Sequence, residues 1–179
     1  YFLMLGANPL ASNGSIWTVP DVRKRIKYLT GRGGKLVVVD PRRTETAELA
    51  SEHHFIRPGT DAALLLALLH VIFRDKLTAL GALGEFTDGL EEVQTAVASL
   101  TPEWAASITG IETFDIERMA RDMATAKAAI CYGRMGVSTQ AYGTICQWAI
   151  QVINVVTGNL DKPGGSLFTR PAMDLSLIH

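Results

Sequence analysis

Short apolar runs that stop at glycine, proline or aspartate predict four β-strands. Residues 1–5 and 35–40 are almost wholly apolar, and 35–40 contains three consecutive valines, as expected for parallel strands covered on both faces. Two further strands are predicted over 54–56 and 128–132. The order strand, helix, strand within the first forty residues is a βαβ unit. We expect its crossover to be right-handed.

Apolar residues at helical spacing predict the helices that connect these strands. Over 17–29 the apolar residues share one face, and a basic cluster forms the solvated face. A strongly apolar helix should begin near residue 61, where Thr60 or Asp61 is suited to cap it. The other predicted helices are 44–50 and 142–157, the second ended by Gly158-Asn159.

The pattern of residues over 76–126 predicts helices and no strand. Thr101-Pro102-Glu103 combines a cap, a proline at the first helical position and an acid in the first turn, and Thr113 is expected to cap a further helix. The predicted fold class is therefore α/β: a Rossmann-like parallel sheet layered with helices, with an all-helical segment between two βα portions. The expected division is 1–75 for the βαβ-rich portion, 76–127 for the helical segment and 128–179 for the start of a second α/β portion.

Composition narrows the function classes. The chain is 47% hydrophobic and 20% charged, which is typical of a folded globular protein, and its net charge of −1 predicts no general attraction to nucleic acid or anionic lipid. The longest apolar run, 62–73, is shorter than the ~20 residues that span a bilayer, so we expect no membrane insertion by this chain. Cys131 and Cys146 form no CxxC pair and are expected to be buried free thiols, with no metal site made by this chain alone.

Candidate chemistry lies where three predicted strands end, because ligands of parallel α/β sheets bind beyond the carboxyl ends of the strands. The three loops are Gly6-Ala-Asn-Pro9, Asp40-Pro-Arg42 and Gly133-Arg-Met-Gly136. Asn8 and Ser12 are suited to bind phosphate or sugar, Asp40 ribose hydroxyls and Arg42 a phosphate. Asp61 is suited to accept paired hydrogen bonds from a guanine edge.

Each of these residues also has a structural interpretation that the sequence leaves open. Asp40 could serve solely to start a loop or cap a helix, Asp61 could serve solely to cap the apolar helix, and Met135 could be a core residue. His53 and His54 are expected to flank a strand at the surface, and His70 to be a core histidine with a hydrogen-bond partner. Neither GxGxxG nor GxxxxGK[ST] occurs, so the usual NAD and P-loop fingerprints are absent.

The ordered motifs of the chain resemble the molybdopterin oxidoreductase family, which includes dimethyl sulfoxide reductase, formate dehydrogenase and nitrate reductases. The resemblance covers nearly the whole chain. Its segments are LGANPLAS (5–12), GGKLVVVDPRRTETAELA (33–50), IRPGTDAALLLALLHVI (56–72), ITGI (108–111), GRMGVSTQAYGT (133–144) and TGNLDKPGG (157–165).

The resemblance implies a bis-molybdopterin guanine dinucleotide cofactor that holds molybdenum, or sometimes tungsten, and two related α/β domains that bind its two dinucleotides. Carried over by motif, Gly6, Asn8 and Ser12 would line the pyrophosphate and pterin side of one dinucleotide, Asp40, Pro41 and Arg42 would lie by its nucleoside, and Asp61 would bind guanine. Met135 and Gly136 would approach from the second domain.

Relatives often have Gln four residues after this Met, whereas this chain has Thr139 there and Gln140 next. The full candidate set is Gly6, Asn8, Pro9, Ser12, Asp40, Pro41, Arg42, Gly59, Asp61, Met135, Gly136, Thr139 and Gln140, with no catalytic and no metal-binding residue.

Members of this family are several times longer than 179 residues, so we interpret the chain as a central fragment. A [4Fe–4S] cluster and the residue that ligates the metal would lie in a preceding part, a small-molecule substrate and an electron-transfer partner would engage the intact enzyme, and the fragment alone would show no turnover. The compartment stays open, with the cytoplasm favoured over the periplasm. Two alternatives are a non-catalytic scaffold, as in a related subunit of respiratory NADH dehydrogenase, and a Rossmann-like domain that binds NAD or accompanies thiamine diphosphate.

Overall fold

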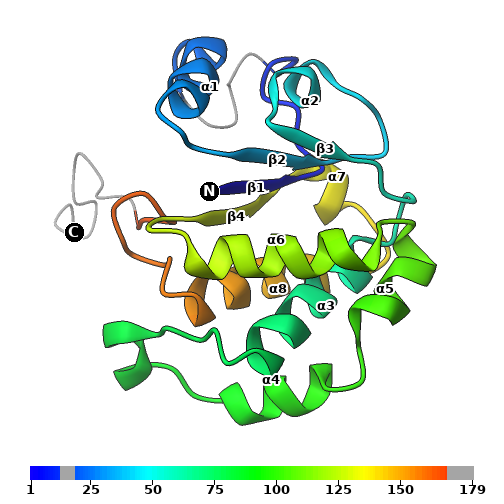
Figure 1. Cartoon of the computed structure of the whole chain (residues 1–179), viewed down its shortest axis with the longest axis vertical. Helices are drawn as coiled ribbons and strands as arrows, with labels where there is room; N and C mark the ends of the chain where they lie inside the picture. The colour runs from blue at the N-terminus through cyan, green and yellow to red at the C-terminus, as the bar shows by residue number, and fades with distance from the viewer. Residues whose placement is uncertain (13–18, 169–179) are drawn as a thin grey trace, which may run out of the picture.

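The strands form one parallel sheet in the order β3-β2-β1-β4, in a computed structural model that describes residues 1–12 and 19–168 (Figure 1). The α/β prediction is therefore confirmed. The strands are β1 (Phe2–Leu5), β2 (Leu36–Val39), β3 (Glu52–His54) and β4 (Ile130–Gly133). The helices are α1 (Val22–Gly31), α2 (Glu45–Leu49), α3 (Asp61–Arg74), the 3-10 helix η1 (Gly81–Glu85), α4 (Leu90–Val97), α5 (Pro102–Thr109), α6 (Thr113–Thr125), α7 (Met135–Ser138) and α8 (Gly143–Val156).

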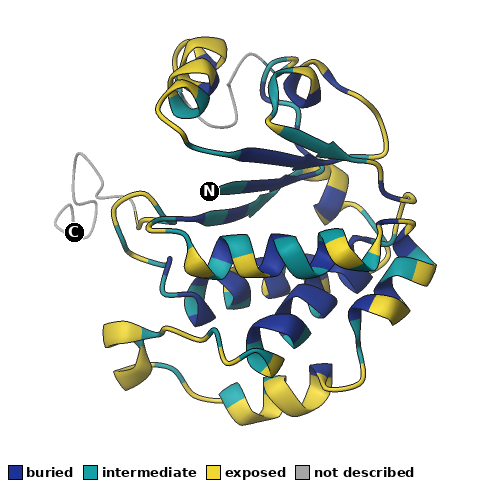
Figure 2. Cartoon of the chain, viewed as in Figure 1, coloured by how far each residue is buried: buried dark blue, intermediate teal, exposed yellow. Residues whose placement is uncertain are grey.

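Both faces of the central strands are covered, which explains their unbroken apolar sequences. Leu3 and Leu5 of β1 pack into a large core with α3, α6 and α8, whereas Met4 between them packs into a smaller core with α1 and α2. Alternate β2 residues divide between the same two cores. Figure 2 shows the buried residues concentrated on the sheet and on the inner sides of these helices. None of the described helices is long and apolar enough to cross a bilayer.

Two predicted boundaries were wrong. Within the described residues α1 begins at Val22, because Asp21 ends the preceding segment with a left-handed backbone (φ 52°) and its carboxylate accepts the Lys24 N–H at 3.2 Å. The predicted residues 17 and 18 lie outside the described residues. Strand β3 occupies 52–54 rather than 54–56, because register with β2 selects those residues for pairing, and the chain then turns so that Ile56 packs into the large core. His53 and His54 are consequently strand residues and half-buried.

The helical segment 76–126 contains η1, α4, α5 and α6, as predicted. Thr101 caps α5 by accepting the Trp104 N–H at 3.3 Å. Thr113 is not the cap of α6, because Glu112 occupies that position without a side-chain bond. His70 lies 3.0 Å from the carbonyl oxygen of Val97, as expected for a core histidine with a partner.

Strand β4 pairs with β1, so the portion predicted to start a second α/β unit extends the first sheet. Its other edge carries no strand in the described residues, and two buried asparagines bind the backbone there. Asn154 of α8 accepts the Cys131 N–H and donates to the Cys131 carbonyl, both at 2.9 Å. Asn159, after α8, accepts the Ala129 N–H at 3.0 Å. Cys131 and Cys146 are buried free thiols, as predicted.

An ion-pair network joins β3 to α6 on the side of the large core. Glu52 accepts two hydrogen bonds from Arg118, at 3.0 and 2.7 Å, and also contacts Lys35 and His54. Burial by itself would raise the pKa of Glu52, but the hydrogen bonds from Arg118, Lys35 and His54 outweigh it and lower that pKa to about 2. The network therefore favours the ionised form of Glu52.

Candidate functional site

Loops that follow all four strands meet at the carboxyl end of the sheet and enclose a cavity of about 310 Å³. Each loop continues directly from a strand or leads into α3, so the rigid sheet fixes their relative positions. The lining residues are Gly6, Ala7, Asn8, Asp40, Pro41, Arg42, Thr44, Pro58, Gly59, Asp61, Gly136 and Gln140. Asn8, Asp40 and Asp61, which are far apart in sequence, therefore face one groove.

Asp61 is the most buried acid of the cavity, at 3% exposure. It begins α3, but the cap position belongs to Thr60, whose hydroxyl instead donates to the Arg57 carbonyl at 2.7 Å. The Asp61 carboxylate accepts the side-chain N–H of Gln140 at 2.6 Å. Burial raises the pKa of Asp61, the Gln140 bond opposes that rise, and the nearby charge of Asp40 adds to it. Asp61 is thus a desolvated carboxylate that binds an amide donor inside the cavity.

Asp40 follows β2, and its side chain orders the loop that it begins. One carboxylate oxygen accepts the Arg42 backbone N–H at 2.8 Å, the local bond typical of an aspartate turn. The imidazole of His53 in β3 donates to the Asp40 carbonyl at 3.1 Å. Pro41 and Arg42 are exposed at the mouth of the cavity. Asp40 therefore starts the loop, as one interpretation of the sequence had it, and it also lines the cavity.

Asn8 holds its loop against α2. Its side-chain oxygen accepts from the buried Thr46 hydroxyl at 2.7 Å, and its amide donates to Glu45 at 2.8 Å, which lowers the pKa of that carboxylate. The hydroxyl of Thr46 also accepts the Leu10 N–H at 3.3 Å. The Asn8 side chain is thus bonded to α2 while it lines the cavity, and its binding of phosphate or sugar stays a prediction.

Two glycines allow β1 and α7 to approach each other at the floor of the groove. Gly6 has φ +54°, and a Cβ there would lie 2.7 Å from the backbone nitrogen of Val137. A Cβ on Gly136 would lie 2.8 Å from Cα of Gly6. The Gly136 N–H donates to the Gly6 carbonyl at 3.0 Å. Any side chain at either position would force the two loops apart.

A smaller cavity of about 80 Å³ adjoins the first and shares Gly6, Ala7 and Asn8 with it. Its remaining lining residues are Pro9, Ser12, Tyr132, Arg134 and Met135. The hydroxyl of Ser12 makes one long bond, 3.5 Å, to the Pro9 carbonyl. Within the described residues the Nε of Arg134 is buried without a hydrogen-bond partner, and so is the side-chain oxygen of Gln140. Unpartnered buried polar atoms at a cavity wall are typical of a binding site.

Twelve of the thirteen sequence candidates line one of these two cavities. The exception is Thr139, whose hydroxyl donates to the Met135 carbonyl at 2.7 Å within its own helix, so that Gln140 faces the groove instead. Met135 is 59% exposed and is not a core residue. Within the described residues no group of three or more His, Cys, Asp or Glu side chains is placed to hold a metal ion.

The sequence analysis missed five lining residues. Ala7, Thr44 and Pro58 line the large cavity, whereas Tyr132 and Arg134 line the small one. The Gly133-Arg-Met-Gly136 break was recognised as a strand end, but the pattern gave no sign that its arginine faces the ligand groove.

Comparisons with known proteins agree with this geometry. Residues 1–171 match the molybdopterin oxidoreductase family. The chain is 34% identical over 160 residues to formate dehydrogenase H of Escherichia coli, covering 89% of this chain and 22% of that protein. It is also 34% identical over 188 residues to the molybdopterin-containing subunit of arsenate respiratory reductase from Chrysiogenes arsenatis, covering 92% and 22%. The structure of acetylene hydratase from Pelobacter acetylenicus superimposes with a TM-score of 0.77 at 27% identity, covering 88% of this chain and 21% of that one. The chain thus spans about a fifth of the length of these relatives.

Proposed function

This chain belongs to the molybdopterin oxidoreductase family, and we propose that it forms a nucleotide-binding part of a molybdopterin guanine dinucleotide site in a longer enzyme. The observation that carries the proposal is the convergence of Asp40 and Asp61 on one cavity of about 310 Å³ at the carboxyl end of a parallel sheet. Nucleotides bind at this end of open α/β sheets because the loops there are free to vary around a fixed scaffold.

The chemistry of Asp61 fits the guanine end of such a ligand. Guanine presents two adjacent N–H donors, and a carboxylate offers two acceptor oxygens side by side. Within the groove Asp61 accepts one amide N–H, from Gln140 at 2.6 Å. With only 3% of its surface exposed, Asp61 favours a partner that replaces this bond over water.

The rest of the large cavity fits a ribose and the start of a phosphate chain. The free carboxylate oxygen of Asp40 is an acceptor for ribose hydroxyls, and Arg42 is an exposed cation at the same mouth. Gly59 has φ +82° and an added Cβ would meet no protein atom within 4 Å, so its lack of a side chain leaves that space for a ligand. Gly6 and Gly136 close the floor with backbone alone.

In the longer enzyme we assign to these residues the binding and orientation of the cofactor. The bound cofactor supplies molybdenum or tungsten on dithiolene sulfurs, which exchanges an oxo group or hydride equivalents with a small-molecule substrate. The second dinucleotide of a bis-cofactor, a [4Fe–4S] cluster and an electron-transfer partner belong to other parts of that enzyme. Several relatives are named as subunits, which supports such a partner. We expect no turnover from this chain alone, so molybdate-dependent reductase activity of the isolated chain would contradict this division of roles.

Calorimetric titration of the chain with GDP, ADP and NAD tests the nucleotide assignment. We expect GDP to bind and to bind more tightly than ADP, because adenine presents an acceptor where guanine presents a ring N–H donor. Asp61→Asn should weaken GDP binding by roughly ten-fold or more, since the new amide opposes a guanine donor with its own. Glu48→Gln on α2, where Glu48 is exposed and lines neither cavity, is the matched control and should leave binding unchanged. Equal binding of GDP, ADP and NAD, or unchanged GDP binding by Asp61→Asn, would overturn the assignment.

A further inference from the structure

One guanidinium nitrogen at the small cavity has no hydrogen-bond partner among the described residues. Arg134 lines it, and Nε of this guanidinium is buried without a hydrogen-bond partner in the described part of the chain. The other half-buried arginine of the described residues, Arg118, binds the carboxylates of Glu52 and Asp115, each at 2.7 Å. No described carboxylate pairs with Arg134 in this way. A buried Nε–H without an acceptor is uncommon in a folded protein, and an anionic ligand in the small cavity would supply that acceptor.

Arg134 has the only charged side chain among the residues that line the small cavity. The side-chain oxygen of Asn8 accepts from Thr46 and one N–H of its amide donates to Glu45, and this side chain carries no charge. The Ser12 hydroxyl, with its single 3.5 Å bond, can turn to donate to a neighbouring oxygen but carries no charge. The only guanidinium among the lining residues is therefore that of Arg134.

The two cavities form one groove because Gly6, Ala7 and Asn8 line both. A nucleoside held by Asp61 and Asp40 in the large cavity would extend its 5′ substituent along these shared residues. We propose that Arg134 binds the diphosphate of that nucleotide in the small cavity and so determines the preference of the site for a dinucleotide-type ligand over a nucleoside. This inference rests on the proposed function. Guanidinium and phosphate match in geometry, since two parallel N–H donors can contact two phosphate oxygens.

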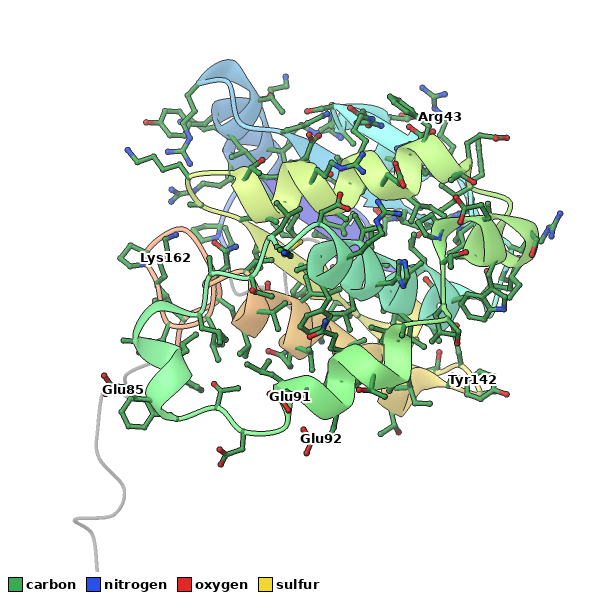
Figure 3. All side chains as sticks on the ribbon, turned by 60° about the horizontal axis from the view of Figure 1, so that its bottom comes forward. Arg43, Glu85, Glu91, Glu92, Tyr142 and Lys162 are labelled. Atoms are coloured by element: carbon green, nitrogen blue, oxygen red, sulfur yellow. The ribbon has the colours of Figure 1, made fainter. Side chains whose placement is uncertain are left out.

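The test compares guanosine and GDP by calorimetry on wild type, Arg134→Gln and Arg134→Lys. Wild type should bind GDP more tightly than guanosine, and Arg134→Gln should remove roughly ten- to hundred-fold of GDP affinity while leaving guanosine binding unchanged. Arg134→Lys keeps the charge without the planar fork and should lie between the two. Arg43→Met is the matched control, because Arg43 is an exposed surface residue that lines neither cavity, and it should leave GDP affinity within two-fold (Figure 3).

A second measurement reports on Arg134 without relying on folding of a variant. Inorganic pyrophosphate should protect Arg134 of wild type from modification by phenylglyoxal, detected by peptide mass spectrometry, and leave Arg43 unprotected. Equal affinity of wild type for guanosine and GDP, or an equal loss of both in Arg134→Gln, would overturn the role of Arg134 and leave the guanine assignment standing. Failure of both guanosine and GDP to bind wild type would instead overturn the proposed function and this inference with it.

Discussion

Replacing Asn154 with leucine should destabilise the chain more than any surface substitution on the same helix. Asn154 is 1% exposed, and its amide occupies the free edge of β4, where it bonds both the N–H and the carbonyl of Cys131 at 2.9 Å. Leucine has the branched shape of asparagine but is larger, so Asn154→Leu opens no cavity and removes both bonds. The backbone groups of Cys131 are then buried without partners, because no strand follows at that edge in the described residues.

The magnitude follows from two orphaned backbone groups. Each buried polar group that loses its partner costs ~1–3 kcal/mol, so Asn154→Leu should lower the free energy of unfolding by ~2–6 kcal/mol. Against a total of ~5–15 kcal/mol for a typical domain, this is a large fraction. With a urea m-value near ~2 kcal/mol/M, the unfolding midpoint measured by circular dichroism should fall by ~1–3 M.

Two further variants separate hydrogen bonding from packing. Gln151→Leu introduces the same side chain at an exposed position of α8 and should change stability by no more than ~0.5 kcal/mol. Asn154→Asp retains the acceptor for the Cys131 N–H. When the acid is ionised, its second oxygen repels the Cys131 carbonyl oxygen, whereas the protonated acid can donate its O–H to that carbonyl. Burial raises the pKa of such an aspartate, so its stability should be highest at low pH and be lost as pH rises through its folded pKa. A cost below ~1 kcal/mol for Asn154→Leu, or no pH dependence of Asn154→Asp relative to wild type, would refute this account of the edge.

Three other predictions test the floor of the groove, the ion-pair network and the thiols. Gly6→Ala should destabilise the chain and weaken GDP binding in the titration described above, because its Cβ would lie 2.7 Å from the Val137 nitrogen at φ +54°. Stability supplied by Glu52 is present above its unfolded pKa of 4.5 and should be lost as pH falls towards its folded pKa of about 2, so Glu52→Gln should flatten the urea-midpoint profile in this range. Burial raises the pKa of Cys131 and raises that of Cys146 to about 11, so neither should react with a disulfide reagent at pH 8 until urea unfolds the chain. Reaction of either thiol in the native chain would contradict its burial.

The hydrophobic pattern predicted a strand correctly where the burial of that strand alone determines its sequence. The continuous apolar sequence of β2 required cover on both faces, and the two cores supply it. The pattern failed at β3, because Phe55 and Ile56 have high strand propensity while pairing with β2 selects the polar residues before them. Such a shift depends on register between strands, which no local window contains.

The sequence also explained Asn159 only in part. Gly158-Asn159 was interpreted as the end of α8, and Gly158 does adopt φ +65° there. The side chain of Asn159 has a second role, accepting the Ala129 N–H at 3.0 Å. That role could not be predicted, because it requires knowing that β4 is an edge strand of the sheet in the described part of the chain. The same limit applies to Arg134, since its contact with the groove depends on β4 lying beside β1.

The edge of β4 and the ligand groove are parts of one mechanical unit. Arg134 and Gly136 follow β4 without an intervening loop, and the Gly136 N–H is bonded to the Gly6 carbonyl across the floor of the groove. The asparagine amides fix one side of β4, and pairing with β1 fixes the other, so the position of both residues is set by backbone bonds rather than by loop packing. Under the proposed function the groove binds a long ligand at separate points, and such binding needs rigidity because a small displacement of one contact weakens all of them together. This is a physical reason for two buried amides to lie behind a site that they never touch.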